Sequence, residues 1–467
     1  MTKSKPKTTS PSSRPLCSPN YSSWANCSPK TSLRKKKSLQ QSGPPIGPNQ
    51  QRLHNKGQRA KPYLSIFGMI TIQRSKYYSP ETGTYYALDA QLNLPKGRYS
   101  YLLQSWIARA ASGEAFGPSL EMLNEILGQH FQAMTAQRIS HHYGHQVDAY
   151  YQVKSPVPPE AEGAALGVSF DGKGVPIIKS ERAGVASQTV RLMKGQKRGT
   201  KKQATVSVSF SFDPVARTPE EVAKSLHRRW NEDEKQARKR VRNQAQERGQ
   251  LPPRQAQHVH KRAFLGPQRK ALDYGVADLK QRQGASGKPI IVLIDGHAGL
   301  VEGVPKALSE AGLSAVAVIL DIVHVSEYLW RAATALLGEA NPQRERWVYA
   351  RLLALLESRV EEVIAELEAI EAPPKAVLEA MRYFGNHRHM MDYKRYLACG
   401  YPVSTGLVEG SCGHLVKDRM EGSGMRWSIA GAQQVLNTRA VNKNGDWEDY
   451  SRFVKEQAQP RVLKHAA

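Results

Sequence analysis

Two short runs of apolar, mostly β-branched residues each end at an Asp-Gly pair, and this repeated pattern constrains the fold more than any other feature of the chain. GVSF leads into Asp171, and PIIVLI leads into Asp295. Apolar runs of about four to eight residues are typical of buried strands. The second run is followed by a helical pattern at 304–311 and by another buried run, LSAVAVILDIV. Strand, helix and strand in succession indicate two parallel strands with a crossover helix, so we expect an α/β fold.

The neighbouring segments predict further strands and helices. GVPIIKS and QATVSVSFSF, which alternates with period two, are expected to be strands. Thr218-Pro219-Glu220-Glu221 is typical of a helix start, with a capping residue, a proline at the first position and acids in the first turn. After Trp330 the chain is expected to be helical, with apolar residues at helical spacing from Leu352 to Ile370 and a stop at Pro373-Pro374.

The two Asp-Gly pairs also have a purely structural explanation. Asp-Gly is a strong turn dipeptide, and Asp171-Gly172 lies between two strand-like runs, as in a plain hairpin. Asp295-Gly296 could likewise be a simple strand exit. Each pair alone is more often a turn than a ligand.

A third carboxylate makes metal binding the preferred explanation. Glu409 lies in STGLVEGSCGHLVKDRMEGSGMRW, on a segment that is expected to be a helix capped by Ser404 or Thr405. Two ions about 3.5–4 Å apart stabilise the attacking and leaving oxygens of phosphodiester cleavage, and Mg²⁺ prefers oxygen ligands. We therefore expect two Mg²⁺ (or Mn²⁺) ions, with Asp171 bridging them, Asp295 holding one ion and Glu409 the other.

Polar residues after the predicted strands are candidates for support of this site. His297 follows Asp295, and Asp321 and His324 follow the next strand. Either histidine could position a carboxylate or a phosphate, or could be a satisfied structural residue at a strand-to-helix junction. Neither has the spacing of a zinc site.

The charge balance points to a polyanionic partner. The chain has a formal net charge of +26, from 67 Lys+Arg against 41 Asp+Glu. Residues 1–80 contain 15 Lys/Arg and no Asp or Glu, so 26 − 15 leaves about +11 for the rest. Cations that neutralise phosphates release counterions and drive sequence-independent binding, which makes double-stranded DNA the expected partner.

Several residues are candidates for DNA contact. RLMKGQKRGTKKQ is a basic, glycine-containing loop, and the block around Glu409 carries further cations. Trp427 could stack on an unpaired base, or it could be a hydrophobic plug under the helix. The candidates are Lys173, Arg198, Lys201, Lys202, Lys417, Arg419, Arg426 and Trp427.

The N-terminal third predicts an arm followed by helices. The first 62 residues are rich in Ser, Pro, Lys and Arg, and we expect them to be disordered. SIFGMITIQRSKYY predicts one or two strands. Two short helices around Gly128, between Ser119 and Tyr143, are typical of a helix-turn-helix, although ordinary helical hairpins share the pattern. Their inward residues are expected to be Leu120, Met122, Leu123, Met134, Ile139 and Tyr143.

The remaining composition excludes other classes of protein. The four cysteines form no C-x-x-C pair, so a zinc finger and a disulfide framework are not expected. The N-terminus has no apolar signal region, and no run approaches 18 apolar residues. We expect no membrane contact and a cytoplasmic location.

The motifs together resemble a known family. DGKG, IDGHAG, DIVH and the long block that ends in GSGMRW are similar to those of bacterial insertion-sequence transposases of the Kra type, in the DDE class and related to the Mutator-like group. The resemblance covers roughly residues 160–440, with a fainter echo from about residue 68. It implies an RNase H-like core with a helical insertion before the final glutamate. Asp171, Asp295 and Glu409 match the catalytic triad, and Asp321 with His324 matches an Asp-x-x-His element.

One departure from the family pattern concerns the N-terminal region. Similar proteins often carry cysteine pairs that form a zinc knuckle, whereas KYYSPETGTYYALDAQL has none. Metal-supported recognition of DNA ends is therefore in doubt for this chain.

The resemblance completes an expected domain plan. The fold class is α/β, with an RNase H-like mixed-sheet core, an all-helical insertion, a small helical domain and a disordered arm. The parts are a basic arm (1–62), a helical DNA-binding domain (63–155), the first part of the catalytic core (156–338), the insertion (339–400), the second part of the core with the Glu409 helix (401–440) and a C-terminal tail (441–467).

The expected function is that of a DDE transposase. It would bind the terminal inverted repeats of its insertion sequence, cleave the DNA ends and transfer strands to target DNA, as a homo-oligomer in the synaptic complex. The resemblance also implies association with a bacterial nucleoid. The alternatives are an RNase H-like structure-specific nuclease and a decayed DNA-binding protein without catalysis.

Overall fold

The chain divides into two compact units. The computed structural model describes residues 44–47, 50–182, 200–226, 256–458 and Leu463, with single positions between 236 and 247. One unit comprises Met1–Tyr63, Ile70–Arg98 and Gln459–Ala467, and the other comprises Leu64–Met69 and Tyr99–Ala458. Within the described ranges, no helix combines the length and apolar character needed to cross a membrane.

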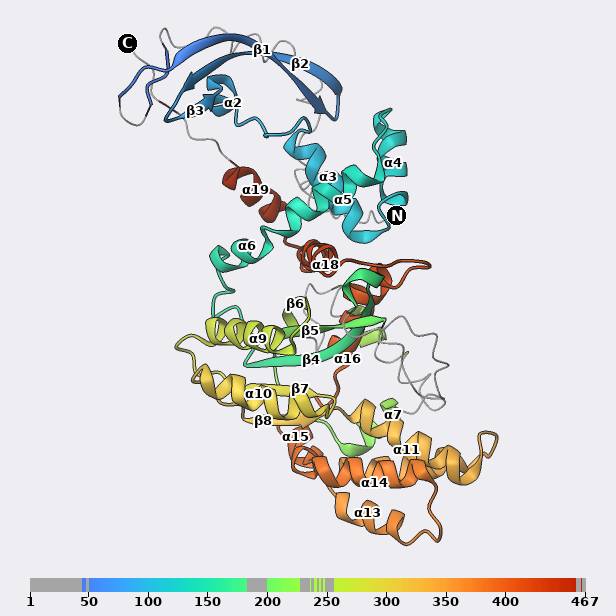
Figure 1. Cartoon of the computed structure of the whole chain (residues 1–467). Coiled ribbons are helices and arrows are strands. Elements are labelled where there is room, and N and C mark those ends of the chain that lie inside the picture. Colours follow the sequence, from blue (N-terminus) through green and yellow to red (C-terminus); the bar gives the residue numbers. More distant parts are fainter. Residues whose placement is uncertain are drawn as a thin grey trace, which may run out of the picture. The chain divides into compact units, whose positions relative to one another are not determined.

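The first unit is built on a small antiparallel sheet. Strands β1 (His54–Ser65), β2 (Gly68–Ser79) and β3 (Gly83–Tyr85) lie in that order, and helix α2 (Ala87–Gln91) follows (Figure 1). Asp89 of α2 forms ion pairs with Lys61 of β1 and Arg74 of β2. The Arg74 guanidinium also lies 3.6 Å from the centre of the Tyr86 ring. Ion pairs and a cation–π contact thus link α2 and the residue before it to both long strands of this sheet.

The predicted boundary of the basic arm is too late. Strand β1 begins at His54, inside the segment that we expected to be disordered. Its first residues lack an apolar alternation, so only pairing with β2 reveals the strand, for example through the 2.8 Å hydrogen bond from Gln58 Nε2 to Ser75 Oγ. Residues 1–43 of the predicted arm lie outside the described ranges.

Helices open the second unit and form a core of their own. α3 (Tyr101–Gly113), α4 (Pro118–Leu127), α5 (Ala133–Gly144) and α6 (Val147–Val153) pack with α19 (Trp447–Gln457). The predicted pair of helices around Gly128 is confirmed, since α4 ends at this glycine with φ 59°. The prediction that Met122 and Met134 face inward is wrong, because both are more than 60% exposed.

A five-stranded mixed sheet forms the centre of the second unit. Its order is β6 (Gln257–Leu265), β5 (Lys201–Phe212), β4 (Ala165–Pro176), β7 (Ile290–Ile294) and β8 (Ala317–Leu320). β4 pairs antiparallel with β5 and parallel with β7, and β7 pairs parallel with β8. Strand β4 runs straight through Asp171 and Gly172, so the alternative of a hairpin at this Asp-Gly pair is wrong.

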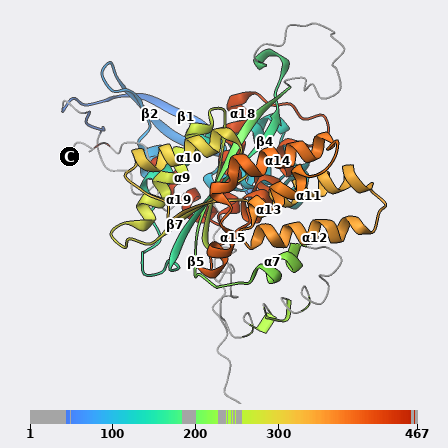
Figure 2. The same cartoon turned by 90° about the horizontal axis from the view of Figure 1, so that it is seen from below.

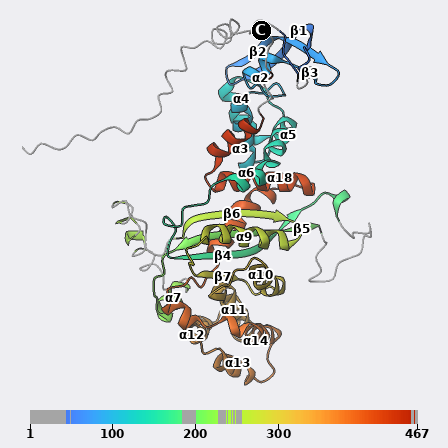
Figure 3. The ribbon, with the colours of Figure 1, turned by 90° about the vertical axis from the view of Figure 1, so that its left-hand side faces the viewer.

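Helices cover both faces of this sheet. α9 (Gln268–Gln283), α10 (Ala298–Glu310) and α11 (Ile322–Leu337) contribute to one core with β4, β7 and β8 (Figure 3). α16 (Gly406–Ser411), the π-helical turn η4 (Cys412–Lys417) and α18 (Ile429–Lys443) form the other core with β5. The segment that carries Glu409 therefore lies on the opposite face from α9 and α10.

A group of helices separates α11 from α16 along the chain. α12 (Gln343–Leu356), α13 (Val360–Glu368), α14 (Lys375–His387) and α15 (Tyr393–Ala398) pack together beside α11 (Figure 2). The sequence predicts continuous helical spacing from Leu352 to Ile370, but the chain breaks between α12 and α13, where Ser358 has φ 63°. Apolar spacing alone does not reveal this break because both helices bury their leucines in one core.

Gly275 tests the close approach of α9 to the sheet. A Cβ atom there would lie 2.4 Å from Ser207 Oγ and 2.9 Å from the Phe170 ring. Gly275→Ala should therefore destabilise the protein by about 1–3 kcal/mol. Gly385→Ala is the matched control, since nothing lies within 4 Å of its Cβ position and alanine is the better helix former. Circular dichroism melting should show a lower melting temperature for Gly275→Ala only. Equal melting temperatures would contradict the packing.

Candidate active site

Asp171 and Asp295 lie at the same level of two neighbouring strands. The parallel register of β4 and β7 pairs Ser169 with Leu293. Two residues further along each chain stand Asp171, within β4, and Asp295, directly after β7. Neighbouring strands are about 4.8 Å apart, and residues at one level of a parallel pair share a face. The fold thus brings these two predicted site residues together, and both are partly exposed.

Glu409 reaches the same region through α16 and η4. Cys412, one turn after Glu409, is 4% exposed and lies near enough to Asp171 for that carboxylate to act on its thiol. Burial raises the pKa of this thiol, and the charges of Asp171 and Glu409 raise it further. Glu409 itself is exposed. A π-helical turn is rare and often occurs at functional sites, and here it turns Cys412 toward Asp171.

The backbone around Asp295 is held from two sides. Its Oδ1 accepts a hydrogen bond from the backbone N–H of His297 at 2.9 Å, and its carbonyl accepts one from the Tyr383 hydroxyl at 2.9 Å. Gly296 has φ 77°, and a Cβ there would lie about 3 Å from Leu320 and Tyr383. Tyr383 comes from α14, so the inserted helices fix the turn that carries Asp295.

Asp321 is a buried connecting residue rather than an exposed ligand. Its side chain is fully buried and caps α11 by accepting from the N–H of Val323 at 3.0 Å. It also accepts from the N–H of Thr405 at 3.1 Å and from the Thr405 hydroxyl. His324 Nδ1 lies 2.9 Å from its Oδ2. Asp321 therefore links the end of β8 to the residue before α16.

His324 is a cation beside the candidate site. Its hydrogen bond with Asp321 raises the pKa of the imidazole to about 9, against the opposing effect of burial. The charges of Asp321, Glu327 and Asp295 act in the same direction as the hydrogen bond. His297 has a different role, since its exposed ring caps α10 by accepting from the N–H of Gly299 at 3.3 Å.

The carboxylates do not form a ready-made metal cage. Among the described residues, no group of three or more His, Cys, Asp or Glu side chains is arranged to hold a metal ion. Asp171 and Asp295 are adjacent oxygen donors, and the Glu409 side chain is exposed on the neighbouring helix. The donor chemistry fits Mg²⁺, which needs few carboxylates because it retains water ligands.

The predicted DNA contacts fall into two groups. Lys417 and Arg426 are exposed. Lys173 and Lys201 lie beside Glu421, with 4.0 Å between Lys173 Nζ and a Glu421 oxygen. Lys202 is half-buried, and Arg198 lies outside the described ranges. The last two of the eight candidates are Arg419 and Trp427.

The prediction that Arg419 and Trp427 contact DNA is wrong, because both side chains are buried. Arg419 is 1% exposed, donates to the Ala111 carbonyl at 3.0 Å, and lies 5.0 Å from the centre of the Phe116 ring and 4.8 Å from that of Trp427. Burial lowers its pKa to about 10. Trp427 donates its indole N–H to the Met420 carbonyl at 3.1 Å. The plug explanation holds for Trp427, and neither side chain is available to DNA in this structure.

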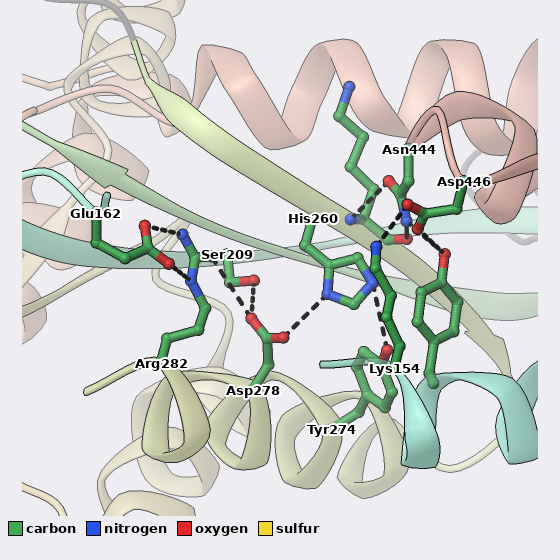
Figure 4. Close-up of polar contacts among 11 residues, drawn as sticks. Lys154, Glu162, Ser209, His260, Tyr274, Asp278, Arg282, Asn444 and Asp446 are labelled. Atoms are coloured by element: carbon green, nitrogen blue, oxygen red, sulfur yellow. Dashed lines mark hydrogen bonds and ion pairs between the residues drawn. The ribbon is translucent and has the colours of Figure 1, made fainter. Parts of the chain in front are cut away.

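A second polar cluster was missed by sequence reasoning (Figure 4). Asp278 accepts hydrogen bonds from Ser209 and from His260, and Arg282 makes a bidentate pair with Glu162 at 2.6 and 2.8 Å. A cavity of about 810 Å³ lies beside it, and its lining includes none of the three carboxylates of the candidate site. These residues come from separate segments, so no sequence motif reveals the cluster. Its charged groups pair with one another, which is typical of a structural joint.

Comparisons with known proteins give little further information. No protein-family model matches the chain, and no curated protein matches it. Among solved structures, the chain is similar to the Drosophila P element transposase strand transfer complex, with a TM-score of 0.25 and 10% identity over 80% of this chain and 86% of that chain. A TM-score this low carries no argument about fold or activity.

The Asp321–His324 pair predicts a pH dependence of stability. The folded pKa of His324, about 9, lies above the ordinary imidazole pKa of 6.5. Its contribution of roughly 1–3 kcal/mol should therefore be complete below pH 6.5 and be lost as the pH rises through 9. Urea denaturation between pH 6 and 10 should show that His324→Gln removes this dependence. Equal pH profiles for the two proteins would contradict the pairing.

Proposed function

We propose that this protein is a DDE transposase that cleaves and joins DNA with two Mg²⁺ ions. The observation that carries the proposal is the placement of Asp171 and Asp295 at one level of adjacent parallel strands, with the Glu409 segment packed against Asp171 through Cys412. The motifs that resemble the Kra-type family contain these same three residues. The helices between Asp321 and Glu409 occupy the place where that family has its insertion.

The proposal includes an RNase H-like core. The mixed order β6-β5-β4-β7-β8, with one antiparallel half and one parallel half, supports it. In open α/β sheets, ligands gather outside the carboxyl ends of the parallel strands, which is where Asp295 lies.

Each residue of the site has a proposed role. Asp171 would bridge the ions, Asp295 would hold one and Glu409 the other. When bound, two Mg²⁺ ions stabilise the attacking and leaving oxygens of an in-line displacement. The exposed Glu409 side chain must turn toward Asp171 for this purpose. His324, held by Asp321, supplies positive charge beside Asp295 and a donor for a DNA phosphate.

DNA is the proposed substrate at both steps. The terminal inverted repeats of the element would be cut first, and the resulting 3′-OH groups would then attack target DNA. Lys417 and Arg426 are exposed near the Glu409 helix, and Lys173, Lys201 and Lys202 line the neighbouring strands. Holding two DNA ends in one complex requires a homo-oligomer.

Two other functions remain as alternatives. A structure-specific nuclease would use the same three carboxylates but would cleave without strand transfer. A decayed DNA-binding protein would bind DNA with an inert core, so substitution of Asp295 would change nothing measurable.

Carboxylate substitution tests the proposed chemistry. In an excision and integration assay, with a marker flanked by the DNA that borders the gene, Asp295→Asn and Glu409→Gln should each reduce movement roughly 100- to 1,000-fold, because several kcal/mol of transition-state stabilisation is lost. DNA affinity should be retained. Asp418→Asn is the matched control, because it changes an exposed carboxylate that lies directly after η4. Movement by Glu409→Gln at the wild-type level would remove Glu409 from the mechanism.

Tyr383 tests the role of the inserted helices. Tyr383→Phe removes the hydrogen bond to the Asp295 carbonyl and should lower DNA cleavage about 10-fold, as expected for about 1.4 kcal/mol. Tyr450→Phe removes a hydroxyl bond to the Tyr143 carbonyl, in the separate core that α3 to α6 form with α19, and should match it in stability while keeping cleavage. Equal cleavage rates for the two variants would show that the Tyr383 bond is only structural.

A further inference from the structure

The positive charge of the described N-terminal half is concentrated in the β-sheet unit rather than in the helices. Residues 44–98 contain eight Lys/Arg and two Asp/Glu, whereas residues 99–154, which include α3 to α6, contain three Lys/Arg and four Asp/Glu. The helical domain where DNA binding was expected therefore has no cationic excess. The charge belongs to the unit that contains most of β1 and β2.

Internal ion pairs account for only part of this charge. Asp89 pairs with Lys61 and Arg74, so its charge does not neutralise the other cations of the sheet. Arg52, Lys56 and Arg59 are exposed, and no carboxylate among the described residues pairs with any of them. Surface cations in this arrangement are free to neutralise an external polyanion.

The first half of β1 is uncovered on both faces. All residues from His54 to Ala60 are exposed, although successive side chains of a strand point to opposite sides. A ribbon of two strands is marginal in water unless something packs on it. The described residues supply no such layer for this stretch, so it forms an open basic surface.

Protection of a sheet edge is the simplest alternative explanation. Proteins often place lysines on edge strands to prevent pairing with other chains. Such edges are usually short, whereas β1 is 12 residues long. The cations also extend to Lys76 on β2, the central strand of this sheet, where no edge needs protection.

We propose that the β1–β2 ribbon is a docking surface for the sugar-phosphate backbone of duplex DNA. The partner follows from charge complementarity, because the exposed cations lie on a 12-residue ribbon about 40 Å long, which matches the length of about 12 base pairs of duplex at a rise of 3.4 Å each. Lys56 and Arg59 of β1, Lys76 of β2 and Arg52, which lies just before β1, carry the contacts. The inference deepens the proposed function by naming the surface that retains DNA, and the ribbon shares no residue with the candidate active site.

A matched pair of charge variants tests this surface in the full-length chain. Arg52→Gln/Lys56→Gln/Arg59→Gln, the ribbon variant, removes three exposed cations at and just before the start of β1. Arg346→Gln/Arg382→Gln/Lys394→Gln removes three from the inserted helices. The probe is a fluorescent random-sequence duplex of about 40 Å or more, titrated between about 50 and 200 mM salt. The ribbon variant should bind roughly 10- to 100-fold more weakly, with a salt slope lower by about 2.7, since each phosphate contact contributes about 0.9. Binding equal to that of the control variant would overturn the proposal.

Lysine acetylation of the wild-type protein tests the same surface without a variant that could fail to fold. Duplex DNA should protect Lys56 and Lys76, while Lys375, which is 89% exposed on α14, should react equally with and without DNA. Lys61 is buried against Asp89 and should stay unreactive in both samples. Unchanged reactivity of Lys56 would overturn the proposal. Stronger protection by single-stranded DNA or by duplex RNA than by duplex DNA would overturn the choice of partner.

The outcomes separate this inference from the proposed function. If the ribbon variant loses binding while wild-type protein cuts no DNA, the ribbon stands and the transposase proposal fails. If the ribbon variant binds normally while Asp295→Asn abolishes cleavage, the active site stands and the ribbon proposal fails.

Discussion

One buried carboxylate, that of Asp321, holds together the part of the fold on which the candidate site depends. Burial of an ionised carboxylate is costly unless charge and hydrogen bonds offset it. His324 supplies the charge, and the N–H groups of Val323 and Thr405 with the Thr405 hydroxyl supply the hydrogen bonds. The chain leaves the sheet at Asp321 and returns at Thr405, so this cluster joins both ends of the inserted helices. The Tyr383 hydroxyl adds a second connection, from within the insertion to Asp295.

The strands that lead to the two aspartates could be predicted because their apolar, mostly β-branched residues indicate burial. The runs before Asp171 and Asp295 became β4 and β7, both strongly buried, and the crossover between the parallel strands β7 and β8 is as expected. The helix in that crossover begins earlier than its pattern indicates, at Ala298, because His297 caps it and Pro305 is accommodated inside it. The start of α7 (Pro219–Leu226) could also be predicted, since Thr218 caps it by accepting from the N–H of Glu221 at 3.2 Å.

The remaining features depend on contacts between distant segments, which composition does not encode. Strand β6 was missed because HVHKRAF is polar and basic, and its burial comes from α18 and from pairing with β5. Arg419 had the appearance of a phosphate ligand, yet its partner is the carbonyl of Ala111, more than 300 residues away in the chain. Glu409 could be placed on a helix, but its approach to Asp171 through Cys412 follows only from the packing of η4 on the sheet.

The convergence of Asp171, Asp295 and Glu409 on bound metal is the central claim, and iron-directed cleavage of the protein backbone tests it most directly. Fe²⁺ that replaces Mg²⁺ reduces added hydrogen peroxide to hydroxide and a hydroxyl radical, and ascorbate reduces the resulting Fe³⁺ again. The radicals cut the chain next to the metal. The account predicts cuts beside Asp171 and Asp295, additional cuts beside Glu409 when duplex DNA is present, and suppression of all of them by excess Mg²⁺. Cuts confined to other segments, such as the one around His258 and His260, would contradict it.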